Sequence, residues 1–329
     1  MKQKIEKSII QSKWYNAFLG ALKKIRIEKR DISAYDILIV FVRKVKKDEI
    51  VERANSVAFN FTLAIFPAII FLFTLIPYIH YPPHLDMRIM KFLQDVMPYS
   101  LYEAAASTIE DIVSKPRGGL LSLGFILALY LATNGMSSLM RAFNKCYRTV
   151  DKRSFIKTKL IATVLTFTLA FELFFAIILL IVGQFFITML DEYMQIKDYV
   201  VHLIVVLRFI VIFIVFLTGI SCIYYLAPAV HNRWRFFSFG SFVATLLSLG
   251  VSYGFSLYIN NFAMYNKLYG SIGALIAMMV WLSILSMVLL LGFEINASID
   301  QATKEKADKM DKIKRRESPQ PILASEVRG

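Results

Sequence analysis

The chain contains six long stretches that are almost free of Asp, Glu, Lys and Arg, and this pattern limits its possible folds most strongly. Each is longer than the roughly 20 residues that cross a hydrocarbon core of about 30 Å as a helix. The stretches lie between Arg53 and Asp86, from Gly118 to Met140, from Leu160 to Leu190, from Tyr199 to Val230, from Phe236 to Asn266 and from Leu268 to Phe293. A backbone in lipid must satisfy its own hydrogen bonds, and alternation with a period of two is absent. We therefore predict an all-α, polytopic membrane protein with six transmembrane helices.

The overall composition supports a membrane environment. Of 329 residues, 57% are hydrophobic and 19% charged, whereas soluble domains have about 45–50% apolar and about 25% charged residues. The net charge of +14 must lie outside the apolar medium. A nucleic-acid-binding protein is also basic, but it does not carry this much hydrocarbon, so we expect no nucleic-acid partner.

The basic residues gather on alternate connections between the predicted helices. They precede the first helix, lie between the second and third and between the fourth and fifth, and follow the sixth. The positive-inside rule then places both termini in the cytoplasm, which an even number of helices requires. Anionic membrane lipids at the cytoplasmic face are the partners that these bases favour. The sequence does not define an oligomeric state.

The predicted domain organisation has three parts. Residues 1–50 form a basic, cytoplasmic amino-terminal region, residues 51–300 the six-helix transmembrane domain, and residues 301–329 a charged, disordered cytoplasmic tail. In the first part, a helical stripe is formed by Ile32, Tyr35, Ile39 and Val42. This amphipathic helix either lies on the inner leaflet or packs on the bundle as a short cytosolic helix.

The connection after the first predicted helix is long and amphipathic. One helical stripe contains Leu85, Ile89, Phe92 and Val96, and a new helix starts after Pro98, where Ser100 and Glu103 fit a capping box. We predict a helical outer segment here. His80 and His84 do not predict a metal site, because Pro82 and Pro83 between them prevent the helix that would align them. We expect no metal and no other cofactor.

Glu172 and Arg208 are single charges inside predicted spans, where charges are costly and usually face a cavity or a partner. If the third span enters the core at Leu160, Glu172 and Arg208 lie at one depth and an ion pair is possible. If Leu190 marks the outer edge, they lie at different depths. The pair either fixes helix packing or lies on a substrate or proton path.

Other polar residues are candidates for a cavity between helices 1 to 4. Asn60 and Pro67 share the first span, where the proline frees a backbone carbonyl and either kinks the helix or exposes its backbone to a cavity. At the cytoplasmic end of the second span, one helical face has Asn134, Ser137, Ser138 and Arg141. This face either lines an inner vestibule or hydrogen-bonds a neighbouring helix.

The sixth span begins with a mixed sequence, "MYNKLYGSIGALIAMMVW". Tyr265 and Tyr269 are predicted anchors in an outer aromatic belt. Two pairs of small residues four apart predict close helix packing, and they are Gly270 with Ala274 and Gly273 with Ala277. Glu294 follows the span, and we expect it at the surface beside the tail lysines.

Three segments resemble the YihY/BrkB family of bacterial inner-membrane proteins from about Val51 to Asp300. They are "AFNFTLAIFPAIIFL", "GFILALYLATNGMSSLMRAFNKCYRTVDKRSFIKTK" and "FSLYINNFAMYNKLYGSIGALIAMMVWLSILSMVLLLGFEINASID". The resemblance implies six transmembrane helices, a location in the bacterial plasma membrane, and a poorly defined role related to transport. Some members have been labelled a tRNA-processing ribonuclease. The resemblance supplies no catalytic residues.

Two functions are compatible with these features. The chain is either a transporter or lipid translocator with a polar cavity between helices 1 to 4, or a non-transporting scaffold that acts in envelope integrity through lipid or protein partners. We do not expect an enzyme. Metal-dependent RNA cleavage needs clustered carboxylates or histidines, and the basic loops contain only isolated acids.

Overall fold

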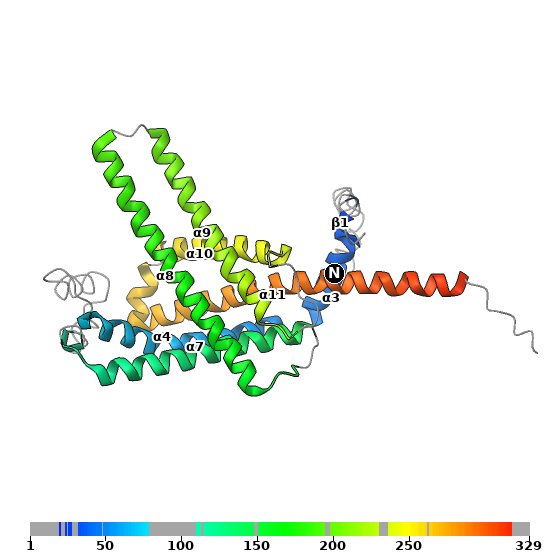
Figure 1. The fold of residues 1–329 in the computed structure, drawn as a ribbon, viewed down its shortest axis with the longest axis horizontal. Helices are drawn as coiled ribbons and strands as arrows, with labels where there is room; N and C mark the ends of the chain where they lie inside the picture. The colour runs from blue at the N-terminus through cyan, green and yellow to red at the C-terminus, as the bar shows by residue number, and fades with distance from the viewer. Residues whose placement is uncertain are drawn as a thin grey trace, which may run out of the picture. The chain divides into compact units, whose positions relative to one another are not determined.

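Figure 1 shows the computed structural model of the chain, which consists almost entirely of helices in the described part. The structure describes residues 32–78 except 48, residues 110–147 except 113 and 114, residues 151–229 except 195–197, residues 236–317 except 262, and positions 20, 24, 26 and 27. The predicted outer segment with its capping pair, Ser100 and Glu103, lies outside these residues. So do His80 and His84.

The elements follow one another along the chain, with the longest separation between η1 and α7. They are β1 (Arg26–Ile27), β2 (Ile32–Ser33), α3 (Ala34–Lys47), α4 (Ile50–Leu75), the 3₁₀ turn η1 (Ile76–Tyr78), α7 (Gly118–Cys146), α8 (Phe155–Met194), α9 (Asp198–Leu226), α10 (Phe239–Asn261) and α11 (Ala263–Glu317). The strands β1 and β2 form a small antiparallel pair, with Ile27 opposite Ile32.

Six helices are long and apolar enough to cross a membrane, which confirms the predicted fold class. They are α4, α7, α8, α9, α10 and α11. Large apolar side chains on these helices point outward, and Phe59, Leu72, Phe171 and Phe209 are each more than half exposed. A surface of this kind is stable in hydrocarbon rather than in water.

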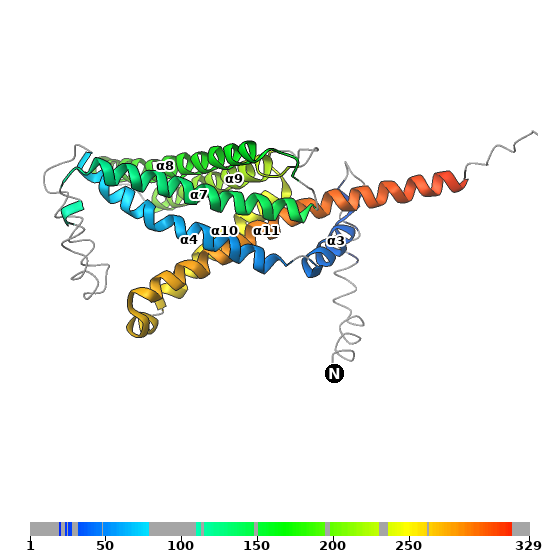
Figure 2. The same cartoon turned by 90° about the horizontal axis from the view of Figure 1, so that it is seen from below.

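The chain divides into two compact units. The membrane unit consists of Glu49–Phe293, and the terminal unit consists of Met1–Asp48 together with Glu294–Gly329. Within the membrane unit, α4 packs along α7, α7 along α8, α8 along α9, and α9 along α10. Figures 1 and 2 both show α4 and α7 running side by side.

Four hydroxyl groups inside the spans form hydrogen bonds within their own helices. Each donates to the backbone carbonyl four residues earlier, at 2.8 Å, and the residues are Thr62, Ser137, Thr166 and Thr245. Such bonds let a polar side chain stay in an apolar medium without a partner from another helix.

Aromatic rings join three helices at the end of the membrane unit where α7 finishes. The Phe143 ring stacks on Phe293 with centroids 4.2 Å apart, and the Tyr224 ring meets Phe293 edge-on at 5.4 Å. The Tyr224 hydroxyl donates to the Leu289 carbonyl at 2.6 Å. A Cβ atom on Gly292 would lie 2.6 Å from this hydroxyl oxygen, so the absence of a side chain allows this packing.

In the terminal unit, α3 begins with a reciprocal cap. The backbone N–H of Asp36 donates to Ser33 Oγ at 3.2 Å, and Ser33 Oγ donates to the Asp36 carboxylate at 2.6 Å. Ile32 and Val40 are buried and pack with Ala302 of α11. Ile39 and Val42, which we assigned to the same stripe as Ile32, are exposed. The proposed contact of α3 with the inner leaflet stays a prediction.

The described part of the tail, residues 301–317, is helical, whereas we expected disorder. Helix α11 continues to Glu317, beyond the predicted boundary at residue 301. Two causes favour this continuation. Residues 301–317 contain five Lys, two Arg, two Ala and two Glu, which form helices readily, and Ala302 is held against Ile32 and Val40.

The expectation that Glu294 lies at the surface is wrong. Its side chain is fully buried, and its carboxylate lies 2.8 Å from the Lys44 ammonium of α3, which is 7% exposed. A buried carboxylate is too costly without a counter-charge, and the lysine supplies it. This ion pair joins the amino-terminal and carboxy-terminal segments of the terminal unit.

We predict that breaking this buried pair destabilises the protein strongly. Glu294→Gln leaves the Lys44 ammonium buried without its carboxylate partner. We expect the free energy of unfolding to fall by about 3 kcal/mol or more. The matched control is Arg43→Gln, which removes the exposed pair of Arg43 with Glu305 and should cost less than about 1 kcal/mol. Thermal unfolding in detergent measures both. Equal effects of the two substitutions would contradict the assignment.

The connection between α7 and α8 is held by a network around Asp151. Its carboxylate accepts hydrogen bonds from Arg153 Nη2 at 2.7 Å and from Asn144 Nδ2 at 3.0 Å. Arg153 also donates to the Ala227 carbonyl, and Asn144 Oδ1 accepts from the Ala229 N–H. The hydrogen bond from the Arg153 side chain is the main reason that the pKa of Asp151 lies below its usual range.

This network predicts a loss of stability in acid. A carboxyl group with a lowered pKa in the folded state stabilises the protein above its ordinary pKa, and the contribution disappears as the pH falls through the lowered value. Asp151→Asn should therefore lower the melting temperature at pH 7, and the difference from the wild type should shrink below about pH 4. Melting curves between pH 7 and pH 3 measure it. A difference that does not change with pH would exclude Asp151 as the titrating group.

Candidate functional site

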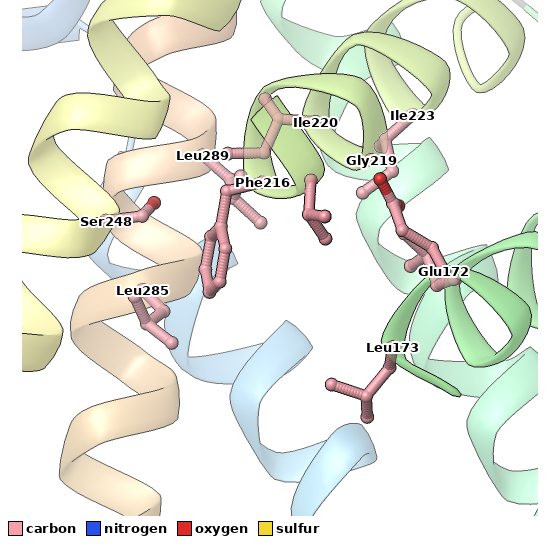
Figure 3. A pocket seen from close by; sticks show the side chains of 11 residues that line it. Glu172, Leu173, Phe216, Gly219, Ile220, Ile223, Ser248, Leu285 and Leu289 are labelled. Carbon is pink, nitrogen blue, oxygen red and sulfur yellow. The ribbon is translucent and has the colours of Figure 1, made fainter. Parts of the chain in front are cut away.

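A groove lies among four helices of the membrane unit, and Glu172 is the charged residue in its wall. Its volume is about 220 Å³. Figure 3 shows Glu172 of α8 beside Gly219 of α9, with Ser248 of α10 and Leu285 of α11 across the space. The remaining lining residues are all apolar, and they are Leu169, Leu173, Val215, Phe216, Ile220, Ile223 and Leu289. The groove is thus an apolar space with one carboxylate and one hydroxyl.

Gly219 provides the room that the Glu172 carboxylate occupies. An added Cβ atom on Gly219 would overlap Glu172 Oε2. The other oxygen, Oε1, is buried and has no hydrogen-bond partner among the described residues. A buried carboxylate oxygen without a partner costs free energy. In a membrane span this feature suggests a function rather than a contribution to stability.

The structure separates Glu172 and Arg208 along the membrane-spanning helices. Glu172 is level with Gly219, which follows Arg208 by eleven positions in α9. At 1.5 Å per residue this separation is about 16 Å along the helix. The arrangement differs from the alternative in which both charges share one depth. The Arg208 side chain itself lies outside the described part of α9.

A second cavity lies where α4 begins and α7 ends. Its volume is about 300 Å³. Residues of both charges line it, together with two serines and an alanine, and they are Glu49, Glu52, Arg53, Ser56, Ser138, Arg141, Ala142 and Lys145. We call it the polar cavity. It shares no residue with the groove at Glu172.

The predicted polar face of α7 is divided between the cavity and helix packing. Arg141 and Ser138 line the polar cavity, and the Ser138 hydroxyl lies 3.3 Å from the Ser56 hydroxyl of α4. Asn134 Oδ1 accepts a hydrogen bond from Lys159 of α8. Ser137 is buried and bonds within its own helix. The face thus contributes to a cavity and to a contact with α8, and its role as an inner vestibule stays a prediction.

The other predicted residues lie away from the two cavities. Asn60 donates to the Ser56 carbonyl at 2.8 Å, and Pro67 lies within the continuous helix α4. Neither residue lines the groove or the polar cavity.

The small residues of the sixth span are described only in part. Gly273 is buried and Ala277 is half-buried in α11, whose backbone includes all four small residues. The surroundings of Gly270 and Ala274 lie outside the described side chains, as do the side chains of the predicted anchors Tyr265 and Tyr269. Their roles in packing and at the interface stay predictions.

Metal ligands do not gather in the described part of the protein. Among those residues, no group of three or more His, Cys, Asp or Glu side chains is close enough to hold a metal ion. The absence of a cofactor stays a prediction.

Sequence reasoning missed two of the relevant residues, Gly219 and Lys44. Each matters only as the neighbour of a charge that is distant in the sequence. For Gly219 a signal was present, because the predicted third span ends at Leu190 and the fourth begins at Tyr199, so that a short connection joins them. Glu172 and Gly219 lie at nearly equal numbers of residues from it, and an antiparallel helix pair brings such positions together.

Comparison with known proteins gives a consistent result. A family model described as "Virulence factor BrkB" matches residues 41–316. The "Putative ribonuclease-like protein YfkH" of Bacillus subtilis is 31% identical over 77% of this chain and 90% of its own length. A "UPF0761 membrane protein" of Psychromonas ingrahamii is 22% identical over 87% of this chain and 94% of its own length. No solved structure matches the chain.

Proposed function

Because the chain belongs to the BrkB family and is a multi-pass bacterial membrane protein, we propose that it moves lipids or similar amphiphilic molecules across the membrane through the groove at Glu172. The single observation that supports this proposal is an apolar groove that contains a carboxylate oxygen without a partner. We further propose the plasma membrane as its location, with both termini in the cytoplasm, on the evidence of the basic connections.

The lining of the groove suits an acyl chain. Phe216, Leu285 and Leu289 provide an apolar surface from two helices. An acyl chain that lies on this surface exchanges one apolar environment for another, so its transfer from the bilayer costs little free energy. The groove therefore favours an amphiphile over an inorganic ion.

Glu172 provides the polar contact that an amphiphile needs inside the membrane. A headgroup that crosses the hydrocarbon core loses its hydration at a high cost. A carboxylate oxygen within the span can accept a hydrogen bond from an ammonium or hydroxyl group and offset part of that cost. The absence of a side chain at Gly219 leaves room for this carboxylate beside α9.

The alternative is a scaffold without transport, and one observation favours it. Phe143, Tyr224 and Phe293 are closely packed where α7 ends, and Gly292 lets the neighbouring helices approach. A rigid end of this kind suits a protein that acts through partners. The groove has no role in this alternative, so the two functions are separable by experiment.

We propose no ribonuclease activity for this chain. The word "ribonuclease-like" occurs in the name of the Bacillus subtilis relative. RNA cleavage by general acid and base needs two titratable groups within reach of each other. The basic connections of this chain offer isolated acids, such as Asp151, which is engaged by Arg153.

Lipid transfer between leaflets tests the proposed function. The protein is reconstituted into liposomes with a fluorescent phospholipid, and the rate at which the inner-leaflet lipid becomes accessible to a membrane-impermeant quencher is measured. Glu172→Gln keeps the shape of the side chain but removes its charge, and Gly219→Ala displaces the carboxylate. Each should slow transfer about tenfold or more, as the loss of one charged hydrogen bond predicts.

A matched control is available in α10. An added Cβ atom at Gly250 has nothing within 4 Å, so Gly250→Ala should leave the rate unchanged. Arg208→Gln tests whether the second intramembrane charge contributes. If both Glu172→Gln and Gly219→Ala transfer lipid as fast as the wild type, the groove is excluded from the transfer. If liposomes with the wild-type protein transfer lipid no faster than protein-free liposomes, the result favours the scaffold.

A further inference from the structure

The polar cavity carries positive and negative side chains around one space, and this combination identifies the ligand that fits it. We propose that it binds a headgroup that has both a phosphate and an ammonium group, as in a phosphoethanolamine lipid. The proposal concerns a site separate from the groove at Glu172, so it does not depend on lipid translocation.

Two helical stripes form the cavity. On α4, Glu52, Arg53 and Ser56 follow Glu49 at the spacing of one helical face, and on α7, Ser138, Arg141 and Lys145 share another. The two stripes approach closely at Ser56 and Ser138, whose hydroxyl oxygens are 3.3 Å apart. Arg53 Nη1 lies 3.8 Å from Cys146 Sγ of α7 and is thereby directed across the gap between the helices.

Four of the charged side chains in the cavity form no ion pairs with one another. None of Glu49, Glu52, Arg141 and Lys145 forms an ion pair with any other residue in the described part of the chain. A ligand with a phosphate alone would meet the two glutamates, which repel it. A ligand with a phosphate and an ammonium can place the phosphate near Arg141 and Lys145 and the ammonium near Glu49 and Glu52.

The size and position of the cavity agree with this ligand. A volume of about 300 Å³ lies at the lower limit of small-molecule sites, about 300–1,000 Å³. The cavity lies where two apolar spans end, and lipid headgroups occupy that level of a bilayer. Ser138 lines the cavity and is buried, with 5% of the residue exposed. Its hydroxyl provides a polar contact for the ligand.

Lipid binding to the purified, delipidated full chain tests the proposal. Phosphatidylethanolamine and phosphatidylglycerol with the same acyl chains are added, and bound lipid is measured by native mass spectrometry. Arg141→Gln and Lys145→Gln should each weaken the binding of both lipids about tenfold, because each removes a charged contact to phosphate. Glu52→Gln should weaken phosphatidylethanolamine alone. Lys152→Gln is the control, since Lys152 is exposed and does not line the cavity.

Soluble competitors distinguish a membrane lipid from a free compound. Displacement of phosphatidylethanolamine by phosphoethanolamine, but not by inorganic phosphate, would support the recognition of both charges of the headgroup. If phosphoethanolamine competes with phosphatidylethanolamine at equal concentration, the ligand is a soluble compound of that chemistry. Equal displacement by inorganic phosphate would overturn the proposal. So would a Glu52→Gln variant that weakens both lipids alike, or cavity variants that bind as the Lys152→Gln control does.

Discussion

The structure depends on one constraint: in hydrocarbon, each polar group has to find a partner within the protein. Helices satisfy the backbone, and hydroxyls such as those of Thr62 and Ser137 bond to their own helix. The buried carboxylate of Glu294 has the Lys44 ammonium as its counter-charge, 2.8 Å away. Glu172 combines two features, because one of its oxygens is buried without a hydrogen-bond partner in the described structure and its side chain lines an apolar groove. The candidate groove is therefore identified by chemistry as well as by shape.

Glycines determine where the helices of the membrane unit approach most closely. Gly124 of α7 lies against the backbone of Phe71, with an added Cβ only 3.2 Å from its nitrogen. Gly292 lets α11 approach α9 and α10, and Gly219 admits the carboxylate of Glu172. Small residues thus serve two purposes here. At Gly124 and Gly292 they allow packing between helices, and at Gly219 a small residue makes room for a functional group.

The six spans were predictable because lipid excludes charge, so the gaps between charges mark them directly. Contacts between segments that are distant in the sequence were not predictable in this way. The sequence around Glu294 contains tail lysines that suggested a surface position, but its partner is Lys44, near the other end of the chain. The depth of Glu172 in the membrane was left open, because residues were counted from either end of the third span and the two ends gave different depths. Counting from the short connection between α8 and α9 would have placed it near Gly219.

The central claim is that the groove at Glu172 holds an amphiphile within the membrane, and a structure of the full chain in lipid nanodiscs tests it most directly. Electron cryomicroscopy should show elongated density along Phe216 and Leu285 that ends near the Glu172 carboxylate. A groove filled by neighbouring side chains, with Glu172 paired to another residue of the protein, would contradict the claim.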